Sequence, residues 1–225
     1  MIRAFVAAVV LLACEASADC MGEWLRAAPD VQVELTSNAH VLVTLGGSHS
    51  SVSPKKLVFV SGTKRVPAEL VRTFDGYQQK LVLVRATLEP GSWELSVDGL
   101  KPAQRLGPWK VVPSADAVVP AFEQPPVAGD TKWTAYGCGP GSSLKVKQVK
   151  TNEPVFIEAA ATVNGQTTVG LLVPREQELE LGHGMCSGGF SFKPGARVSV
   201  VLTPVDFAGN RGAPSERLTF TAPSP

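Results

Sequence analysis

The chain has almost no excess of charge of either sign and few aromatic residues. Its 21 lysines and arginines stand against 20 acidic residues, a formal charge of +1, and aromatic residues make up 7%. A near-neutral chain lacks the concentrated basic surface that a nucleic-acid partner requires. It also lacks the cationic surface needed for strong electrostatic capture by anionic membranes. We therefore expect no nucleic-acid partner.

Beyond residue 18, the sequence also lacks long apolar runs and helical periodicity. No later run approaches the roughly 20 apolar residues that a membrane span needs. No segment keeps a 3.6-residue apolar period with caps, and the helical candidate at 24–28 is too short to matter. The chain is instead rich in valine and holds 21 glycines and 18 prolines. That composition is typical of short strands separated by turns.

Residues 1–18 have the pattern of a secretory signal peptide. Arg3 supplies a positive n-region, residues 4–13 form an uncharged apolar run, and Ala-Ser-Ala at 16–18 gives a small-x-small cleavage pattern. An exported protein folds where disulfides can form. We expect a periplasmic, outer-membrane-associated or secreted protein that begins after Ala18.

A lipid anchor is the alternative. Leu-Leu-Ala-Cys at 11–14 resembles a lipobox, in which the cysteine is acylated and becomes the first residue. Leu12 is bulkier than the usual occupant and the signal would be short, so we favour cleavage after Ala18. Membrane attachment is expected only if Cys14 is lipidated.

Alternating apolar and polar residues predict two series of short strands. Turn dipeptides such as Asp75-Gly76 and Asp98-Gly99 separate them. The first series covers residues 40–45, 56–60, 66–74, 80–86 and 93–97, and the second covers 144–147, 155–161, 168–173, 175–181, 198–202 and 218–221.

Prolines at positions 113, 120, 125 and 126 mark a semi-rigid connector between the two series. We predict an all-β fold with a first β-sandwich domain at 19–112, a Pro-rich linker at 113–126 and a second β-sandwich domain at 127–225. A single larger sandwich is the alternative.

Two short sequence segments resemble hairpins of known β-sandwich modules. Residues 88–97 (LEPGSWELSV) resemble the L-x-P-G-T-Y-x-L-x-V hairpin of bacterial immunoglobulin-like domains, and the end of 202–210 (LTPVDFAGN) resembles the D-x-A-G-N turn of bacterial fibronectin type III and Ig-like modules. Asp206 can form an Asx turn, while Gly209 and Asn210 tolerate positive φ. The resemblance implies two tandem Ig-like β-sandwich domains and names no ligand.

Three cysteines follow the signal peptide: Cys20, Cys138 and Cys186. Three pairings are possible, and each leaves one thiol over. We favour a Cys138–Cys186 disulfide because both residues lie in Gly-rich turns of the second half. Chain entropy gives such a link roughly 4 kcal/mol. Cys20 is then an inert thiol or a covalent link to a partner.

His183, Met185 and Cys186 are potential soft-metal ligands within one turn, and copper could use all three. A periplasmic metal-handling protein or enzyme that uses them is therefore the alternative function. Against it, His40 and His49 are distant in sequence, and an oxidised Cys186 offers no thiolate. We predict no metal ligand and no cofactor.

Two patterns resemble nucleophile motifs without the context that those motifs need. Residues 184–188 match G-x-nucleophile-x-G, but the segment 189–195 that follows cannot form the required helix. Ser48 precedes His49, yet no third member of a triad is identifiable. We predict no catalytic residue and no enzyme.

Charged residues alternate with apolar ones on two predicted strands. Lys145 and Lys147 share one face, and Glu176, Glu178 and Glu180 share another. We interpret these as solvent faces that can form cross-strand Lys–Glu pairs. Calcium binding is disfavoured because neighbours on one strand face lie about 7 Å apart.

The sequence thus predicts an exported, non-catalytic β-sandwich protein with a binding, adhesion or envelope-structural role. The expected partner is an unidentified protein or glycan of the cell envelope. Such modules bind through loops at sandwich ends or through edge strands. The candidate loops are Gly46–Lys55, Gly137–Ser143 and His183–Gly189.

Overall fold

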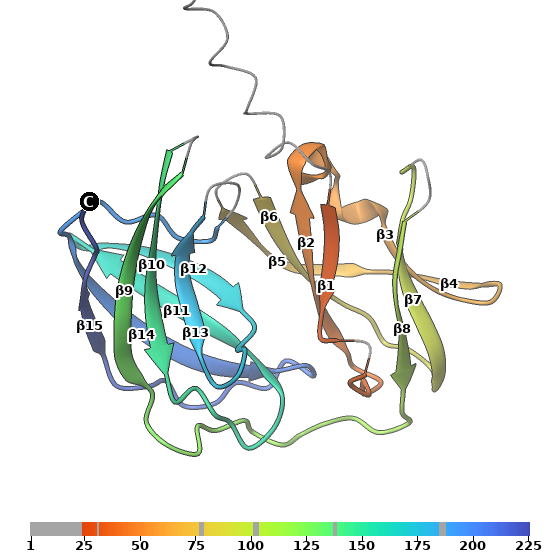
Figure 1. Ribbon diagram of the computed structural model, residues 1–225. Helices are drawn as coiled ribbons and strands as arrows, with labels where there is room; N and C mark the ends of the chain where they lie inside the picture. The colour runs from red at the N-terminus through yellow and green to blue at the C-terminus, as the bar shows by residue number, and fades with distance from the viewer. Residues whose placement is uncertain (1–23, 31, 77–78, 101–103, 137–138, 185–187) are drawn as a thin grey trace, which may run out of the picture.

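The computed structural model describes residues 24–30, 32–76, 79–100, 104–136, 139–184 and 188–225, and they form an all-β protein (Figure 1). The strands assemble into four sheets in which every pairing is antiparallel. The predicted fold class is confirmed. The predicted signal peptide lies outside the described residues.

Two four-stranded sheets make up the first half of the chain. The first inner sheet pairs β1 (Trp24–Ala28), β2 (His40–Gly46), β6 (Gln79–Arg85) and β5 (Glu69–Gly76) in that order. The first outer sheet pairs β4 (Lys64–Pro67), β3 (Leu57–Ser61), β7 (Gly91–Val97) and β8 (Arg105–Val111). The short 3-10 helices η2 (Gly47–Ser51) and η3 (Pro54–Lys56) follow β2. Buried side chains of both sheets pack together, so this half is a β-sandwich.

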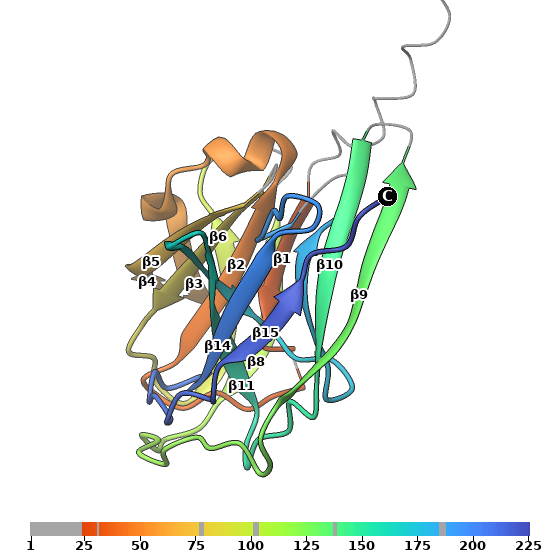
Figure 2. The same cartoon turned by 90° about the vertical axis from the view of Figure 1, so that its left-hand side faces the viewer.

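The second half repeats this layered arrangement with different strand numbers. The second inner sheet pairs β12 (Gln166–Leu172), β11 (Val155–Val163), β14 (Arg197–Asp206) and β15 (Leu218–Thr221). The second outer sheet pairs β13 (Leu179–His183), β10 (Gly139–Lys147) and β9 (Val127–Tyr136). In the view turned by 90°, β9 and β10 extend past their neighbours (Figure 2). A second buried cluster fills the space between these sheets.

A third apolar cluster joins the two halves. It contains Leu42, Phe74, Leu81 and Leu83 from the first inner sheet, and Phe156, Leu171 and Val205 from the second. The rings of Phe156 and Phe207 meet edge to face, with centroids 4.7 Å apart. Each inner sheet is therefore buried on both faces over part of its area, once inside its own sandwich and once against the other half.

Some predicted strands differ from the observed ones. The segment 66–74 is divided between β4 and β5, and the segment predicted at 175–181 enters a strand only at Leu179. Glu176 and Gln177 have φ of 49° and 63°, and the backbone of Arg175 bonds to that of Glu178 in both directions. This tight turn removes Glu176 and Glu178 from the strand, so the predicted row of three glutamates on one strand face is wrong.

Three observed strands were not predicted. β1 occupies the segment 24–28 that offered a short helical pattern, and all five of its residues pair with β2. β8 contains Gly107 and Pro108, two residue types that are uncommon inside strands, so the sequence did not indicate a strand there. β9 has no buried residue and therefore gives no apolar alternation.

In the described part of the chain, no helix is long and apolar enough to cross a membrane.

Candidate functional site

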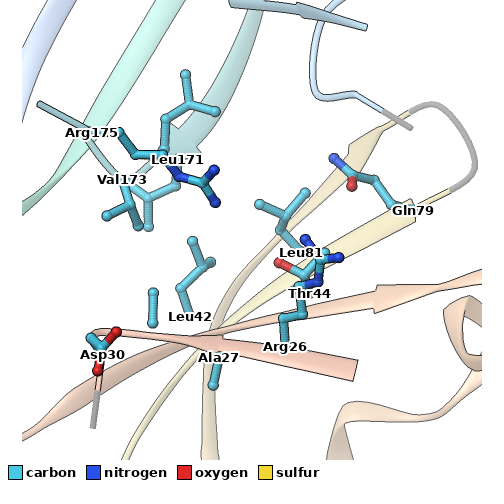
Figure 3. Close-up of a pocket in the computed structure, with 12 residues that line it drawn as sticks. Arg26, Ala27, Asp30, Leu42, Thr44, Gln79, Leu81, Leu171, Val173 and Arg175 are labelled. Atoms are coloured by element: carbon cyan, nitrogen blue, oxygen red, sulfur yellow. The ribbon is translucent and has the colours of Figure 1, made fainter. Parts of the chain in front are cut away.

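The two inner sheets diverge on one side and enclose a groove of about 700 Å³ (Figure 3). Strands β1, β2 and β6 form one wall, and β12 with the segment after it forms the other. Antiparallel register sets Arg26 beside Thr44 and Thr44 beside Leu81, so these three side chains form a row across the first wall. The groove therefore exists only where the halves meet.

The floor of the groove is apolar and continuous with the core between the halves. Leu42, Leu81 and Leu171 line the groove and also belong to the third apolar cluster, with exposed fractions of 4%, 8% and 2%. Val173 lies nearer the rim and is 40% exposed. Packing between the halves holds these side chains in place, so the groove is preformed.

Two arginines face the groove from opposite walls. Arg26 projects from β1, and Arg175 is held by the tight turn after β12. Figure 3 shows the Arg175 side chain extending into the space beside Leu171 and the Arg26 side chain lying near Thr44 and Leu81. Both are exposed, and among the described residues neither has an ion pair or a side-chain hydrogen bond. Their charge is available to a ligand.

A smaller hollow of about 420 Å³ adjoins the groove and shares Leu172, Val173 and Arg175 with it. Here Lys145 Nζ lies 2.7 Å from Glu178 Oε2, an ion pair between β10 and the turn before β13. This hydrogen bond and the charge of Glu178 raise the pKa of Lys145. The pair confirms the predicted contact between the lysine-bearing strand and the glutamates, and it neutralises Lys145.

The D-x-A-G-N turn connects the halves at another point. Asp206 is 1% exposed, and its Oδ1 accepts hydrogen bonds from the N–H groups of Ala208 (2.8 Å) and Asn210 (2.7 Å). The predicted Asx turn is confirmed. Gly209 has the expected positive φ of 92°, whereas Asn210 does not, so that part of the prediction is wrong. The N–H of His40 donates to the carbonyl oxygen of Phe207 at 2.6 Å, which docks the turn on the first half.

Three carboxyl groups gather behind this turn. Oxygen atoms of Asp116, Glu153 and Asp206 all lie within 4.8 Å of one another, and this is the group among the described residues that could hold a metal ion. Glu153 Oε1 is buried without a hydrogen-bond partner in the described structure. Burial raises the pKa of Glu153, and the charges of Asp116 and Asp206 raise it further. The Asn210 side-chain amide donates to the Asp116 carbonyl oxygen (3.1 Å) and so ties the connecting segment to this turn.

The structure places His183 at the end of β13, far in sequence from the other histidines. Its Nδ1 lies 3.2 Å from the carbonyl oxygen of Phe190 and its Nε2 lies 3.2 Å from that of Pro140. No cluster of three ligand-type His, Cys, Asp or Glu side chains within the described ranges includes a histidine. Cys14, Cys20, Cys138, Met185 and Cys186 lie outside the described residues. The Cys138–Cys186 disulfide stays a prediction.

The Ser48–His49 pair lies on η2. His49 is 5% exposed, and its Nε2 lies 3.3 Å from Gln104 Nε2. The imidazole is therefore packed into the first half.

The three predicted binding loops differ in their observed structure. The segment 46–55 folds largely as η2 and η3. Residues 139–143 belong to β10 and pair with β9, so the prediction of a loop there is wrong. In the third loop, His183 ends β13 and bridges to Gly188, while residues 185–187 lie outside the described part.

Sequence reasoning missed the groove altogether. The sequence did contain a signal for it: the strands that form the groove floor have consecutive apolar residues, so both of their faces are apolar. Val41, Leu42 and Val43 are consecutive buried residues of β2, and residues 81–84 of β6 are all buried. A strand with one solvent face alternates, so such a run indicates that both faces are covered.

No protein-family model matches the chain, and no curated protein matches it. Among solved structures, the chain is similar to the Yersinia pseudotuberculosis adhesin InvE, with 15% identity over 88% of this chain and 58% of that chain and a TM-score of 0.25. A β-1,2-glucanase from Parabacteroides distasonis is 11% identical over 81% of this chain and 30% of that chain, with a TM-score of 0.34. Tandem Ig repeats of Dlar are 10% identical over 89% of this chain and 98% of that chain, with a TM-score of 0.26. The chain thus spans 58% of the adhesin and 30% of the glucanase, and likenesses this low carry no argument about activity.

Proposed function

We propose that this chain is an exported, non-catalytic protein of Ig-like β-sandwich modules that binds a partner from the cell envelope in the groove between its halves. The observation that carries the proposal is the groove itself. It has a preformed apolar floor and two arginines on opposite walls that have no ion pair in the described structure. Concave apolar sites with a few polar groups are the usual form of binding sites.

The chemistry of the groove lining supports binding over catalysis. Among the described residues, the lining contains no histidine, cysteine, serine, lysine or tyrosine, and Asp30 is its one carboxylate. General acid–base and nucleophilic catalysis need a titratable group paired with a second group within hydrogen-bond reach. Asp30 Oδ1 instead accepts the N–H of Gln32 at 3.2 Å. Export is proposed on the signal-peptide pattern of residues 1–18.

Affinity capture from an envelope extract tests the proposal. Thr44 lies in the row of side chains that crosses the first wall, so Thr44→Trp should fill the groove with an indole ring. Thr219 is an exposed residue of β15 outside the groove lining, and Thr219→Trp is the matched control. We expect the wild-type chain and Thr219→Trp to retain the same partner saturably, and Thr44→Trp to lose it. Equal retention by all three, or no saturable retention by the wild type, would contradict binding in the groove.

A further inference from the structure

We infer that the groove binds an extended, acidic segment of a partner protein, with Arg26 and Arg175 as the groups that recognise its carboxylates. The inference rests on the proposed function, because it names the ligand class of the same groove.

Charge complementarity is the first argument. Arg26 and Arg175 are exposed, line opposite walls and have no ion pair among the described residues, whereas Arg72 and Arg211 both pair with Glu158. Lys145 in the adjoining hollow is already neutralised by Glu178. A guanidinium presents a planar fork of donors that matches a carboxylate and can bind it through two hydrogen bonds. Two such groups outnumber the carboxylate of Asp30 in the described lining, so the lining is net positive and fits a ligand with acidic groups at separate positions.

The floor favours a peptide over a glycan. The buried side chains between the two arginines are the aliphatic Leu42, Leu81 and Leu171, and none of the described residues that line the groove is aromatic. In the described part of the lining, the neutral hydrogen-bonding side chains are Thr44 and Gln79. A sugar presents many hydroxyl groups, each of which needs a partner when it is buried. Aliphatic side chains of a peptide match this floor without leaving polar groups unpaired.

The strands beside the groove favour an extended conformation. β1 and β12 both stand at the end of their sheets, and each pairs with one neighbour in the described structure. An edge strand has a row of backbone N–H and C=O groups that an added strand can use. An extended segment between them can combine backbone pairing with side-chain contacts to the floor and to the two arginines.

Peptide selection tests the ligand class. Phage-displayed linear peptides of about twelve residues, long enough to span a strand, are selected on the immobilised chain without its signal peptide. The most enriched peptide is synthesised, and its Kd is measured by fluorescence polarisation. We expect enrichment of Asp and Glu next to aliphatic residues. The Arg26→Gln/Arg175→Gln double variant should bind this peptide at least about tenfold more weakly, since one charged hydrogen bond is worth at least a factor of ten.

Arg197→Gln/Arg217→Gln is the matched control, because it removes the same charge from two exposed arginines that do not line the groove. It should leave the Kd within about twofold of the wild-type value. No selected peptide, peptides without acidic residues, or equal weakening by both double variants would overturn the inference. If Arg26→Gln/Arg175→Gln keeps the envelope partner while Thr44→Trp loses it, the groove binds but the arginines do not select an acidic ligand. If both variants keep the partner, the proposed function fails as well.

Discussion

Position 209 requires glycine for two reasons. Its backbone is left-handed, and its α-carbon faces the first half. Its φ is 92°, and an added Cβ would lie 2.6 Å from Cε1 of His40. We expect Gly209→Ala to lower the free energy of unfolding by about 1–3 kcal/mol through backbone strain and this contact. Gly165 has φ of 79° with no atom within 4 Å of an added Cβ, so Gly165→Ala measures the strain alone. In urea unfolding, equal losses for the two variants would show that the contact with His40 contributes nothing.

Glu153 makes stability depend on pH in the opposite sense from an ordinary ion-paired carboxylate. Burial, with Asp116 and Asp206 nearby, raises its pKa above the usual 4.5, so the folded state binds the proton more tightly than the unfolded state. Its contribution to stability is greatest below pH 4.5 and is lost as the pH rises through the folded pKa. At neutral pH the folded state must hold the Glu153 carboxylate charged in a buried, acidic environment, which costs stability. Glu153→Gln removes this cost, so we expect a higher Tm than wild type at neutral pH and a smaller difference in acid. A Tm below that of wild type at neutral pH would contradict this.

The turn at 206–210 shows what a short motif can predict. The Asx turn was predictable because Asp206 and its donors Ala208 and Asn210 lie within five consecutive residues. The contact of Gly209 with His40 was not predictable, because it depends on how two halves pack. Local hydrogen bonds follow from local sequence, whereas docking requires the tertiary fold.

At the level of elements, strands were predictable where one face is buried and the other is not. β7 alternates clearly, with Trp93, Leu95 and Val97 buried, and its strand was predicted. β9 was missed because none of its residues is buried, so its place depends on backbone pairing with β10. The turn at Glu176 and Gln177 was missed because neither residue type favours positive φ.

A substitution of Phe156 on β11 tests whether the strands of one half depend on packing against the other half. It is 0% exposed and packs in the third apolar cluster against the first inner sheet. Phe156→Ala should lower the free energy of unfolding by about 3–5 kcal/mol, and hydrogen exchange should accelerate in β2 and β6 as well as in β11. Phe59→Ala is the matched control, because Phe59 is also 0% exposed but belongs to the core of the first sandwich; it should accelerate exchange in β2 and β6 and leave exchange in β11 unchanged. Unchanged exchange in β2 and β6 of Phe156→Ala would show that the sheets do not depend on this contact.

At the level of the whole molecule, the all-β class was predictable and the candidate site was not. Arg26 and Arg175 each look like ordinary solvated cations in the sequence. They acquire a common role because β1 and the segment after β12 form opposite walls of one groove. The proposed boundaries of the two domains at 19–112 and 127–225 stay predictions, although the strands do stop at Val111 and resume at Val127.

Site-directed photo-crosslinking in living cells tests most directly whether the groove between the halves is the binding surface. A photoreactive amino acid replaces Gln79, which lines the groove, or Gln166, an exposed glutamine at the start of β12 outside the groove lining. We expect one specific adduct from position 79 that disappears when Thr44→Trp is added, and no such adduct from position 166. The same adduct from both positions, or an adduct from position 166 alone, would contradict binding in the groove.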